Sequence, residues 1–562
     1  MNNLLDKIVQ SKRYQFLVFF ALLIFLSLLM MYFYQPLCPG QDFFFHYRRL
    51  QALMDGMKDS PWLIYIDYSA IDGYGYLTKA FYPDFILIPF ALLGNLTDAA
   101  FAYQFMIFTM TVLCGVFTYI TVNTIYKSSY AAAIAALLYT FAAYRLLDIY
   151  HRAAIGEALS FTFVPIVFLG LYHIIKGDYK KWYVLAIGFS LMIFTHLISS
   201  VLMFVAILIF LGIYYKSLLR EPRRIKYLVW AGVATLIITA YYIFPMMEQM
   251  LSNTFYYESR GLMSKAQDSA LGLHWIIWGM FVGIIIPEQA LIPGVGLLLT
   301  FGIILRLFVY EKSKELRSLD IAVIVGFIYI IACLPIFPWS VFPFSLLNFI
   351  QLPWRLLEFS CFFFAVAGGY YLSRILKTNK RLLAGGVMIV VGIALVLVND
   401  AQSYKKYRCE RPVTQSADIL NDYHLGGLEY IPDRVPSVEY LHQRGDSVKS
   451  NYGGMQISDF KRSGRITTFN LNATNGEALE LPLIYYKGYT ASLDGKTVPV
   501  SESDNGLVQL SGNQSGGIEV YYGGTIIQRI SLCITVLSIL SLCIFIFLQR
   551  RRQNEAGWPY SR

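Results

Sequence analysis

The chain has 562 residues, of which 56% are hydrophobic and only 15% are charged. This composition excludes an ordinary soluble protein, because several apolar runs approach the roughly 20 residues with which a helix crosses a bilayer. The formal net charge of +10 does not indicate nucleic-acid binding. Most basic residues lie in short clusters between apolar runs, as in the cytoplasmic loops of membrane proteins. We therefore expect an all-α polytopic protein of the cell (plasma) membrane, with the lipid bilayer and no nucleic acid among its partners.

The apolar runs predict about twelve transmembrane helices. The first run, 16–34, is longer than the apolar core of a signal peptide and follows basic residues, so we expect a retained signal-anchor with its N-terminus inside. The later predicted spans are 101–125, 131–144, 159–175, 182–194, 197–215, 228–244, 291–309, 321–336, 356–372, 382–398 and 526–548. Runs 85–93 and 271–286 are expected to enter the membrane without crossing it. Basic clusters alternate with these spans so that both termini are cytoplasmic.

The chain divides into three predicted regions. Residues 1–399 form the transmembrane module, with a large first outer loop at 35–84. Residues 400–524 form an extracytoplasmic β-rich domain, preceded by a linker near 404–427, and 525–562 contain the final helix and a basic cytoplasmic tail. The strongest hairpin signal is the Asp494-Gly495 pair between two short alternating runs.

Seven cysteines are present. Five lie within apolar runs and are expected to be packing residues, namely Cys114, Cys333, Cys361, Cys533 and Cys543. Cys38 and Cys409 are both predicted to lie just outside the membrane. A disulfide between them stays open, because separation in space cannot be read from sequence.

The first outer loop begins with a group of ionisable residues. If the segment after Pro39-Gly40 is helical, Asp42, His46 and Arg49 share one face, which suits proton abstraction and phosphate binding. A solvated, self-paired amphipathic helix is the alternative. Asp67 is the next candidate acid in this loop, followed by Asp72, although both also fit an ordinary Gly/Tyr-rich loop.

The second outer loop, 145–157, carries further ionisable residues next to the bilayer, where they need a partner or a function. Asp148 and Arg152 are spaced to pair with each other. Glu157 has no local cation in helical register, so it is either functional or the partner of a distant arginine.

Two later positions are also candidates. His196 lies at the tip of a predicted helical hairpin, as a ligand, a hydrogen-bond donor or a capped interfacial residue. Arg355 suits bidentate binding of phosphate, and an internal pair with Glu358 is the alternative. No local metal-ligand spacing is present, and a divalent metal assembled from separate loops stays open.

Several short motifs together resemble a known group of proteins. They are PGQDFFFHYRRL at 39–50, HRAAIGE at 151–157, THL at 195–197, PWR at 353–355, and LPLIYYKGY at 481–489 followed by DGK at 494–496. The first four are similar to the ordered landmarks of bacterial polytopic proteins named as related to 6-pyruvoyl-tetrahydropterin synthase, which resemble the GT-C superfamily of glycosyltransferases. The last two are similar to the C-terminal region of YfhO-type membrane proteins of the same broad group.

The resemblance implies a GT-C-like fold and a polyprenyl-phosphate-linked sugar as donor. An acid in the first outer loop would be the catalytic base, which matches Asp42, and outer-loop arginines would hold the lipid phosphate. No W-W-D motif is present, which favours an envelope glycan or polymer as acceptor over a protein. The candidate catalytic residues are Asp42, Glu157 and Asp67, and the candidate substrate-binding residues are His46, Arg49, His151, Arg152, His196 and Arg355.

The predicted function is therefore transfer of a sugar, with inversion, to an envelope acceptor on the extracytoplasmic face. A transporter or lipid flippase is one alternative, for which ionisable residues near mid-membrane would be expected. A non-catalytic envelope scaffold with a glycan-binding outer domain is the other.

Overall fold

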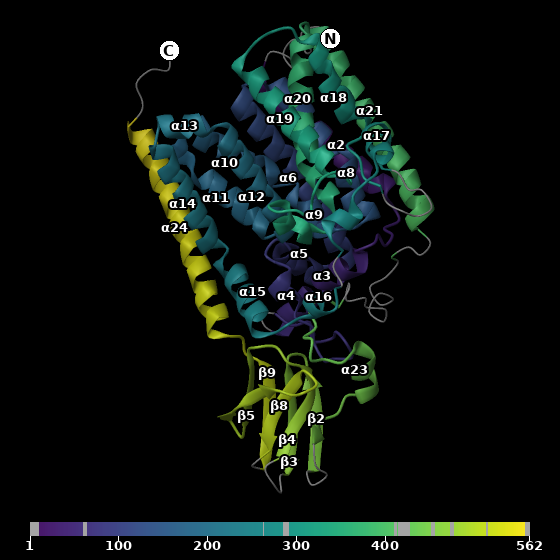
Figure 1. Ribbon diagram of the computed structural model, residues 1–562, viewed down its shortest axis with the longest axis vertical. Coiled ribbons are helices and arrows are strands. Elements are labelled where there is room, and N and C mark those ends of the chain that lie inside the picture. Colours follow the sequence, from purple (N-terminus) through teal and green to yellow (C-terminus); the bar gives the residue numbers. More distant parts are fainter. Residues whose placement is uncertain are drawn as a thin grey trace. The chain divides into compact units, whose positions relative to one another are not determined.

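The computed structural model describes residues 11–59, 65–261, 264–284, 292–409, 413, 428–450, 456–472, 477–512 and 515–556. It is mostly helical, with β-strands confined to the C-terminal part (Figure 1). The chain forms two compact units that do not follow chain order. The first contains residues 1–47, 93–229 and 263–422, and the second contains residues 48–92, 230–262 and 423–562.

Six helical stretches among the described residues are long and apolar enough to cross a membrane. They are α2 (Lys12–Phe33), α6 (Ala99–Tyr126), Ser129–His151 with α7 (Ser129–Thr140), Pro353–Ile375 with α20 (Leu357–Ile375), α21 (Asn379–Arg408) and Ile526–Arg552 of α24 (Ile526–Ala556). Helices α14 (Arg223–Ile238) and α15 (Ala240–Ser252) would add a seventh span if their 67° bend is counted within one crossing.

Several predicted spans correspond to helices shorter than a straight crossing requires. These are α10 (Val164–Ile175), α12 (Leu197–Ile213) and the stretch Leu297–Phe308, which begins with α18 (Leu297–Ile304). Helix α17 (Leu273–Val282) is also short and lies in the run 271–286, which was not expected to cross. The structure thus supports a membrane-embedded helical protein with six or seven candidate spans, and the larger number stays a prediction.

The other helices with described bounds are not candidate spans by themselves, and two of them correspond to the predicted spans 182–194 and 321–336. They are α3 (Phe43–Asp59), α4 (Thr78–Phe81), α5 (Ile88–Leu96), α8 (Ala143–Leu146), α9 (Ile155–Ser160), α11 (Tyr183–Ile193), α13 (Tyr215–Arg220), α16 (Tyr256–Ser259), α19 (Lys314–Ala332) and α23 (Val438–Arg444). Helix α5 corresponds to the short apolar run at 85–93, which was not expected to cross.

Burial separates central from peripheral helices in the first unit. The Ser129–His151 stretch is 94% buried and Pro353–Ile375 is 89% buried, whereas α21 is only 17% buried. Helix α20 packs on α7, α18 and α19. At Gly369 of α20 an added Cβ would lie 2.7 Å from the Ala131 carbonyl oxygen of α7, so the close packing of these helices requires a residue without a side chain.

The hairpin of α6 and α7 follows from two adjacent residues. Lys127 adopts a left-handed conformation (φ 56°) that ends α6. The Ser128 side chain then accepts a hydrogen bond from the Ala131 amide and starts α7. This tight turn lets the two helices pack against each other.

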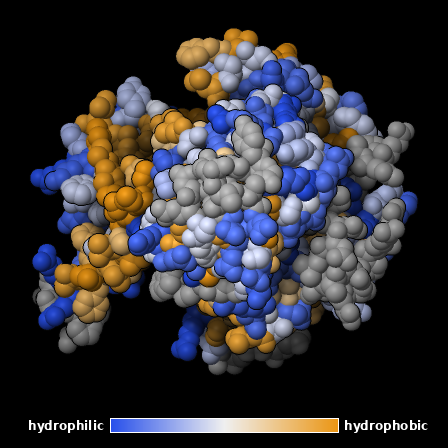
Figure 2. Space-filling view, turned by 90° about the horizontal axis from the view of Figure 1, so that it is seen from below, coloured by the Kyte–Doolittle hydropathy of each residue, from blue (hydrophilic) through white to orange (hydrophobic). Residues whose placement is uncertain are grey.

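Helix α24 belongs to the second unit. Only 17% of its apolar, membrane-spanning stretch is buried against the rest of the protein. Its apolar side chains are exposed, for example Leu537 at 63% and Phe547 at 65%. Figure 2 shows hydrophobic residues gathered at the left, the side on which Figure 1 draws α24, while hydrophilic residues predominate among the coloured residues of the near face. A bare apolar surface of this length suits contact with lipid.

The C-terminal strands form two antiparallel sheets. One has the order β1 (Lys449–Ser450), β4 (Glu477–Ile484), β8 (Leu507–Gly512) and β7 (Val500–Glu502). The other has the order β2 (Gln456–Ser463), β3 (Ile466–Asn472), β9 (Gly516–Tyr522), β5 (Tyr489–Leu493) and β6 (Lys496–Val498). Leu479 and Leu510 of the first sheet share one buried core with Phe469 and Val520 of the second, as in a β-sandwich.

The predicted hairpin at Asp494-Gly495 is confirmed. Strands β5 and β6 pair with Leu493 opposite Lys496, and both turn residues have positive φ (45° and 79°), as a type I′ turn requires. Strands β1, β2 and β8 were not predicted. Most of the predicted 404–427 linker lies outside the described residues.

Two predictions about cysteines have different outcomes. Cys38 and Cys409 form a disulfide, and the Tyr404 hydroxyl hydrogen-bonds both the amide and the carbonyl of Cys38. Cys114, Cys333 and Cys361 are buried as expected. The prediction that Cys533 and Cys543 pack is wrong, because both are exposed on α24, where protein covers little of the apolar surface.

Candidate functional site

Four of the sequence motifs, here called landmarks, meet within the first unit. They begin at residues 39, 151, 195 and 353. The Gln41 amide donates to the His151 carbonyl (3.2 Å), and the Asp42 amide donates to the Arg152 carbonyl (2.7 Å). Gly156 lies against the third landmark, because an added Cβ would be 3.2 Å from the Thr195 carbonyl oxygen. The fourth landmark joins through an ion pair to Glu157, described below. Segments more than 300 residues apart in the sequence therefore form one cluster.

Gly40 permits the close contact between the first two landmarks. An added Cβ would lie 2.6 Å from the Tyr150 carbonyl oxygen and 2.8 Å from the Ala153 Cβ, distances that no side chain tolerates. Only glycine therefore brings the backbone before Asp42 onto residues 150–153.

The segment that receives Gly40 has an unusual backbone. The π-helix η1 (Leu147–His151) follows α8, and Ala153 has a positive φ of 53°. Single π-turns and left-handed non-glycine residues are uncommon and concentrate at functional sites. This turn leads into α9, which carries Glu157.

The centre of the cluster is a buried network of two arginines and two carboxylates. Arg152 Nη1 lies 2.6 Å from Asp148 Oδ1 and 2.9 Å from Glu157 Oε2. Arg355 Nε lies 3.0 Å from the same Glu157 oxygen. The Tyr144 hydroxyl donates to the other Glu157 oxygen at 2.5 Å. Buried charges of this kind are stable only when paired, and here they are.

This network decides between the alternatives that the sequence left open. The Asp148–Arg152 pair is confirmed. Glu157 does have a distant arginine partner, Arg355, and it also binds Arg152, which lies five residues earlier and therefore outside helical register, as expected. The π-turn and the turn after it place Arg152 beside Glu157 at a spacing that an α-helix does not provide. The Arg355–Glu358 pair does not form, since Glu358 accepts instead from the Ser160 hydroxyl at 2.6 Å.

Asp42 lies next to this network but, unlike Asp148 and Glu157, it is not buried. Its side chain is exposed, and no cation among the described residues lies within salt-bridge distance of its carboxylate. Protein atoms crowd its other sides, and the resulting loss of hydration raises the pKa of the Asp42 carboxyl above its ordinary value. The positive charges of Arg152 and Arg355 oppose this rise. The cluster thus presents one accessible acid beside two buried arginines.

Both arginines keep donor groups that their partners do not use. Among the described residues, Arg152 makes its hydrogen bonds through Nη1 alone. Arg355 uses Nε and Nη1, which bind Glu157, the Ile350 carbonyl and the Gln351 side chain. The Nη2 groups of both residues are therefore left for another oxygen-rich acceptor. Guanidinium groups suit phosphate in this role.

The histidines near the cluster have structural partners. His151 Nε2 lies 3.1 Å from Asp400 Oδ1, and the Tyr34 hydroxyl binds the other oxygen of Asp400. The His196 side chain accepts from the Ser199 amide and caps α12, a role that was not among those predicted for it. Asp400 was missed, although an acid that follows directly on a long apolar run is a signal for a functional or paired group.

The helix after Asp42 forms as predicted but is not solvated. Phe43 and Tyr47 stack at 5.1 Å, one helical turn apart. His46 and Arg49 are buried, so the alternative of a self-paired surface helix is wrong. Asp42 precedes the first residue of α3, and the His46 amide donates to its carbonyl (3.2 Å).

Arg49 and Asp67 belong to the second unit, where each is held in an ion pair. Arg49 Nη2 lies 2.7 Å from Asp84. Asp67 receives two hydrogen bonds from Arg48, at 2.9 and 3.0 Å. The Asp67 amide and carbonyl also pair with Tyr76, as an ordinary Gly/Tyr loop would. Asp72 contacts His442.

The part of the chain that the structure describes contains no group of side chains that could hold a metal ion. No three His, Cys, Asp or Glu side chains there lie close enough to share an ion. The Asp148 and Glu157 carboxylates are also already bound by arginine. The residues at this cluster therefore do not fit a divalent metal.

Comparison with known proteins adds one relative. No protein-family model matches the chain. The chain is 23% identical, over 628 aligned residues, to an "uncharacterized protein" of Lactococcus lactis subsp. cremoris (strain MG1363), and the alignment covers 97% of this chain and 98% of the relative. The similarity therefore includes the helical region and the C-terminal strands alike.

Proposed function

We propose that this protein is an inverting, GT-C-like membrane glycosyltransferase. It moves a sugar from a polyprenyl-phosphate donor to a cell-envelope acceptor on the extracytoplasmic face, and its helices cross the membrane about twelve times. The observation that carries the proposal is the position of Asp42, an exposed acid without a salt-bridge partner among the described residues, beside the buried Arg152 and Arg355. The meeting of four distant landmark segments at this point supports it further.

In the proposed reaction Asp42 removes the proton of an acceptor hydroxyl. The hydroxyl oxygen then attacks the anomeric carbon of the sugar from the side opposite the lipid phosphate. The bond between the anomeric carbon and the phosphate oxygen breaks, and its electron pair leaves with the polyprenyl phosphate. The Nη2 groups of Arg152 and Arg355 stabilise the negative charge that develops on this phosphate. Glu157 holds both guanidinium groups in place.

The test is sugar transfer by the purified full chain in liposomes, with radiolabelled polyprenyl-phosphate sugars and envelope extract as acceptor. Asp42→Asn should lower the transfer rate at least about 100-fold, since general bases contribute that much or more, while donor binding persists. Asp55→Asn is the matched control. It removes an exposed acid of α3 that pairs only with Lys58 among the described residues, and it should leave the rate unchanged.

Acid pH should act on the same group. A base works only when deprotonated, so the wild-type rate should fall as the pH drops through the raised pKa of Asp42. This loss should occur above the range of about pH 4 that is ordinary for aspartate. Transfer that survives in Asp42→Asn would contradict the assignment of the base.

A lipid flippase is the second candidate function. Arg145 is 1% exposed within the Ser129–His151 candidate span. It donates to the Thr140 carbonyl (2.9 Å) and the Thr111 hydroxyl (3.1 Å), and no carboxylate among the described residues forms a salt bridge with it. Ionisable residues at such positions mark transport pathways. Translocation of a labelled polyprenyl-phosphate sugar across these liposomes, without transfer, would favour this candidate.

A further inference from the structure

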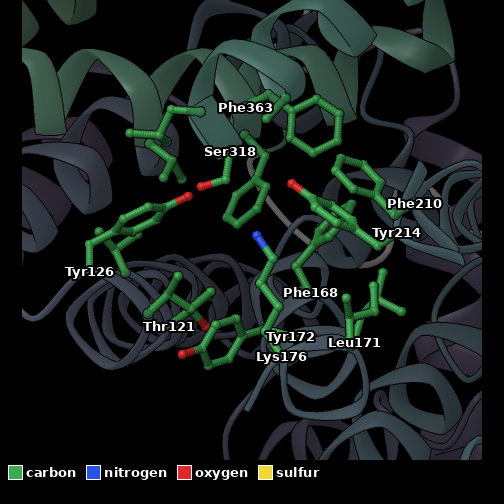
Figure 3. A pocket seen from close by; sticks show the side chains of 17 residues that line it. Thr121, Tyr126, Phe168, Leu171, Tyr172, Lys176, Phe210, Tyr214, Ser318 and Phe363 are labelled. Atoms are coloured by element: carbon green, nitrogen blue, oxygen red, sulfur yellow. The ribbon is translucent and has the colours of Figure 1, made fainter. Parts of the chain in front are cut away.

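A cavity lies within the first unit, away from the candidate site, among residues of α6, α10, α12, α19 and α20 (Figure 3). Its volume is about 120 Å³, and most of its lining side chains are apolar or aromatic. Phe168 stacks on Phe362 at 5.2 Å and meets Phe210 edge-on at 5.5 Å. Apolar cavities of about 150 Å³ stay dry and take up apolar molecules. This cavity therefore suits part of a hydrocarbon chain.

One cation enters this apolar space. Lys176 follows the last residue of α10, and its amine points into the cavity (Figure 3). The Lys176 Nζ lies 4.2 Å from the centre of the Tyr214 ring. Loss of hydration lowers the pKa of this lysine, and the charge of Glu315 partly opposes that shift. No salt bridge holds Lys176 among the described residues, so an anion beside its amine would be favoured.

A basic cleft of about 440 Å³ adjoins the apolar cavity and shares Lys176 and Tyr214 with it. Its ionisable lining residues are Lys176, Lys216, Arg220, Arg224 and Glu221. Arg224 binds Glu221 (2.9 Å) and the Ile174 carbonyl (2.8 Å). Lys216 and Arg220 have no salt bridge with any residue that the structure describes. An excess of positive charge therefore lies where the apolar cavity opens.

We propose that the cavity and the cleft together bind an amphiphile with a phosphate headgroup. The hydrocarbon chain enters the apolar cavity, and Lys176, Lys216 and Arg220 hold the phosphate. The sequence predicts this end of the helices to be cytoplasmic, whereas the transfer site is predicted on the outer face. The inference therefore goes beyond the proposed function and does not depend on it. An anionic glycerophospholipid and a polyprenyl phosphate share the required chemistry.

The experiment is lipid binding to the purified full chain in detergent, measured by native mass spectrometry. The probes are phosphatidylglycerol, undecaprenyl phosphate and zwitterionic phosphatidylcholine. At least one of the first two should bind about fivefold more tightly than phosphatidylcholine, and the tighter of them identifies the source of the ligand. Equal binding of all three would overturn the proposal. Full displacement of bound lipid by equimolar inorganic phosphate would also overturn it, because the hydrocarbon chain of the lipid would then contribute nothing to the affinity.

Three variants locate the site. Lys176→Gln should weaken binding of the phosphate amphiphile about fivefold, and Lys176→Arg should restore it. Ala322→Phe should weaken binding by filling the apolar cavity while the basic cleft stays intact, since Ala322 lines only the cavity. Lys226→Gln, which removes an exposed lysine that lines neither space, is the control. Equal losses in Lys176→Gln and Lys226→Gln would mean general surface attraction and would refute the site.

Discussion

Glu157 and Asp42, two acids of the candidate site, differ in their burial and in their hydrogen-bond partners. Glu157 is 1% exposed and accepts hydrogen bonds from Tyr144, Arg152 and Arg355. Asp42 is exposed and has no salt bridge with a described residue. Burial with three partners makes Glu157 a structural anchor that positions the arginines. Crowding without a partner disfavours the charged form of Asp42, which suits a base that must accept a proton.

Glu157→Gln should therefore destabilise the protein strongly. It removes the only ion-pair partner of Arg355 among the described residues and leaves that guanidinium buried, which costs about 3–5 kcal/mol of the free energy of unfolding. Unfolding in detergent, followed by circular dichroism, measures this loss. Glu311→Gln is the control, because the Glu311–Arg374 pair at 3.4 Å is exposed, and its loss should cost less than about 1 kcal/mol. Similar losses for both variants would contradict the anchoring role.

At the scale of elements, the site depends on a few backbone positions that let loops approach closely. The π-helix η1, the positive φ of Ala153 and the missing side chain of Gly40 together bring Asp42 to Arg152. The Cys38–Cys409 disulfide ties the same loop to the end of α21. Packing from several sides holds this backbone geometry, so small changes where Gly40 meets residues 150–153 should lower the stability of the protein.

Gly40→Ala should disrupt the contact. The new Cβ would meet the Tyr150 carbonyl oxygen at 2.6 Å, and the displacement should cost about 1–3 kcal/mol of stability. Thermal unfolding measures this effect, and sugar transfer should fall with it if Asp42 is the base. Gly386→Ala, on α21, is the matched control, since no atom lies within 4 Å of its added Cβ. An unchanged melting temperature for Gly40→Ala would show that the loop is not held against residues 150–153.

At the scale of the whole molecule, two kinds of surface divide the chain. Helices α2, α21 and α24 leave most of their membrane windows uncovered by protein, at 28%, 17% and 17% buried. The β-sandwich buries its apolar residues in a core that it shares with residues 65–81 and 255–256 of the same unit, and it presents charged turns such as Asp494-Gly495-Lys496. Lipid solvates the first kind of surface and water the second.

This division predicts which positions a membrane-impermeant maleimide reaches. In a background with Cys533→Ser and Cys543→Ser, Lys496→Cys in the β5–β6 turn should be labelled in intact cells. Lys180→Cys, in the exposed turn after α10, should be labelled only after permeabilisation, because positively charged loops are retained inside. Labelling of Lys180→Cys in intact cells would refute the predicted topology.

Local rules in the sequence alone determined several features. Apolar run length predicted a membrane-embedded helical protein, because backbone groups in lipid must be satisfied within helices. The Asp494-Gly495 pair predicted its hairpin, because type I′ turns require positive φ at both positions. The Asp148–Arg152 pair followed from spacing on a helix. Local rules do not determine the number of crossings, because short apolar helices such as α10 satisfy hydropathy without the length of a full span.

Only the tertiary structure decided which distant groups meet. Glu157 pairs with Arg355, 198 residues later, and His151 with Asp400, 249 residues later. The Cys38–Cys409 bond spans 371 residues. Periodicity cannot report such contacts, because it describes which face a residue occupies and not what that face packs against. The pairing of Arg152 with Glu157 was missed for the same reason, since a π-turn and a left-handed alanine set it, and both are stabilised by the packing around them.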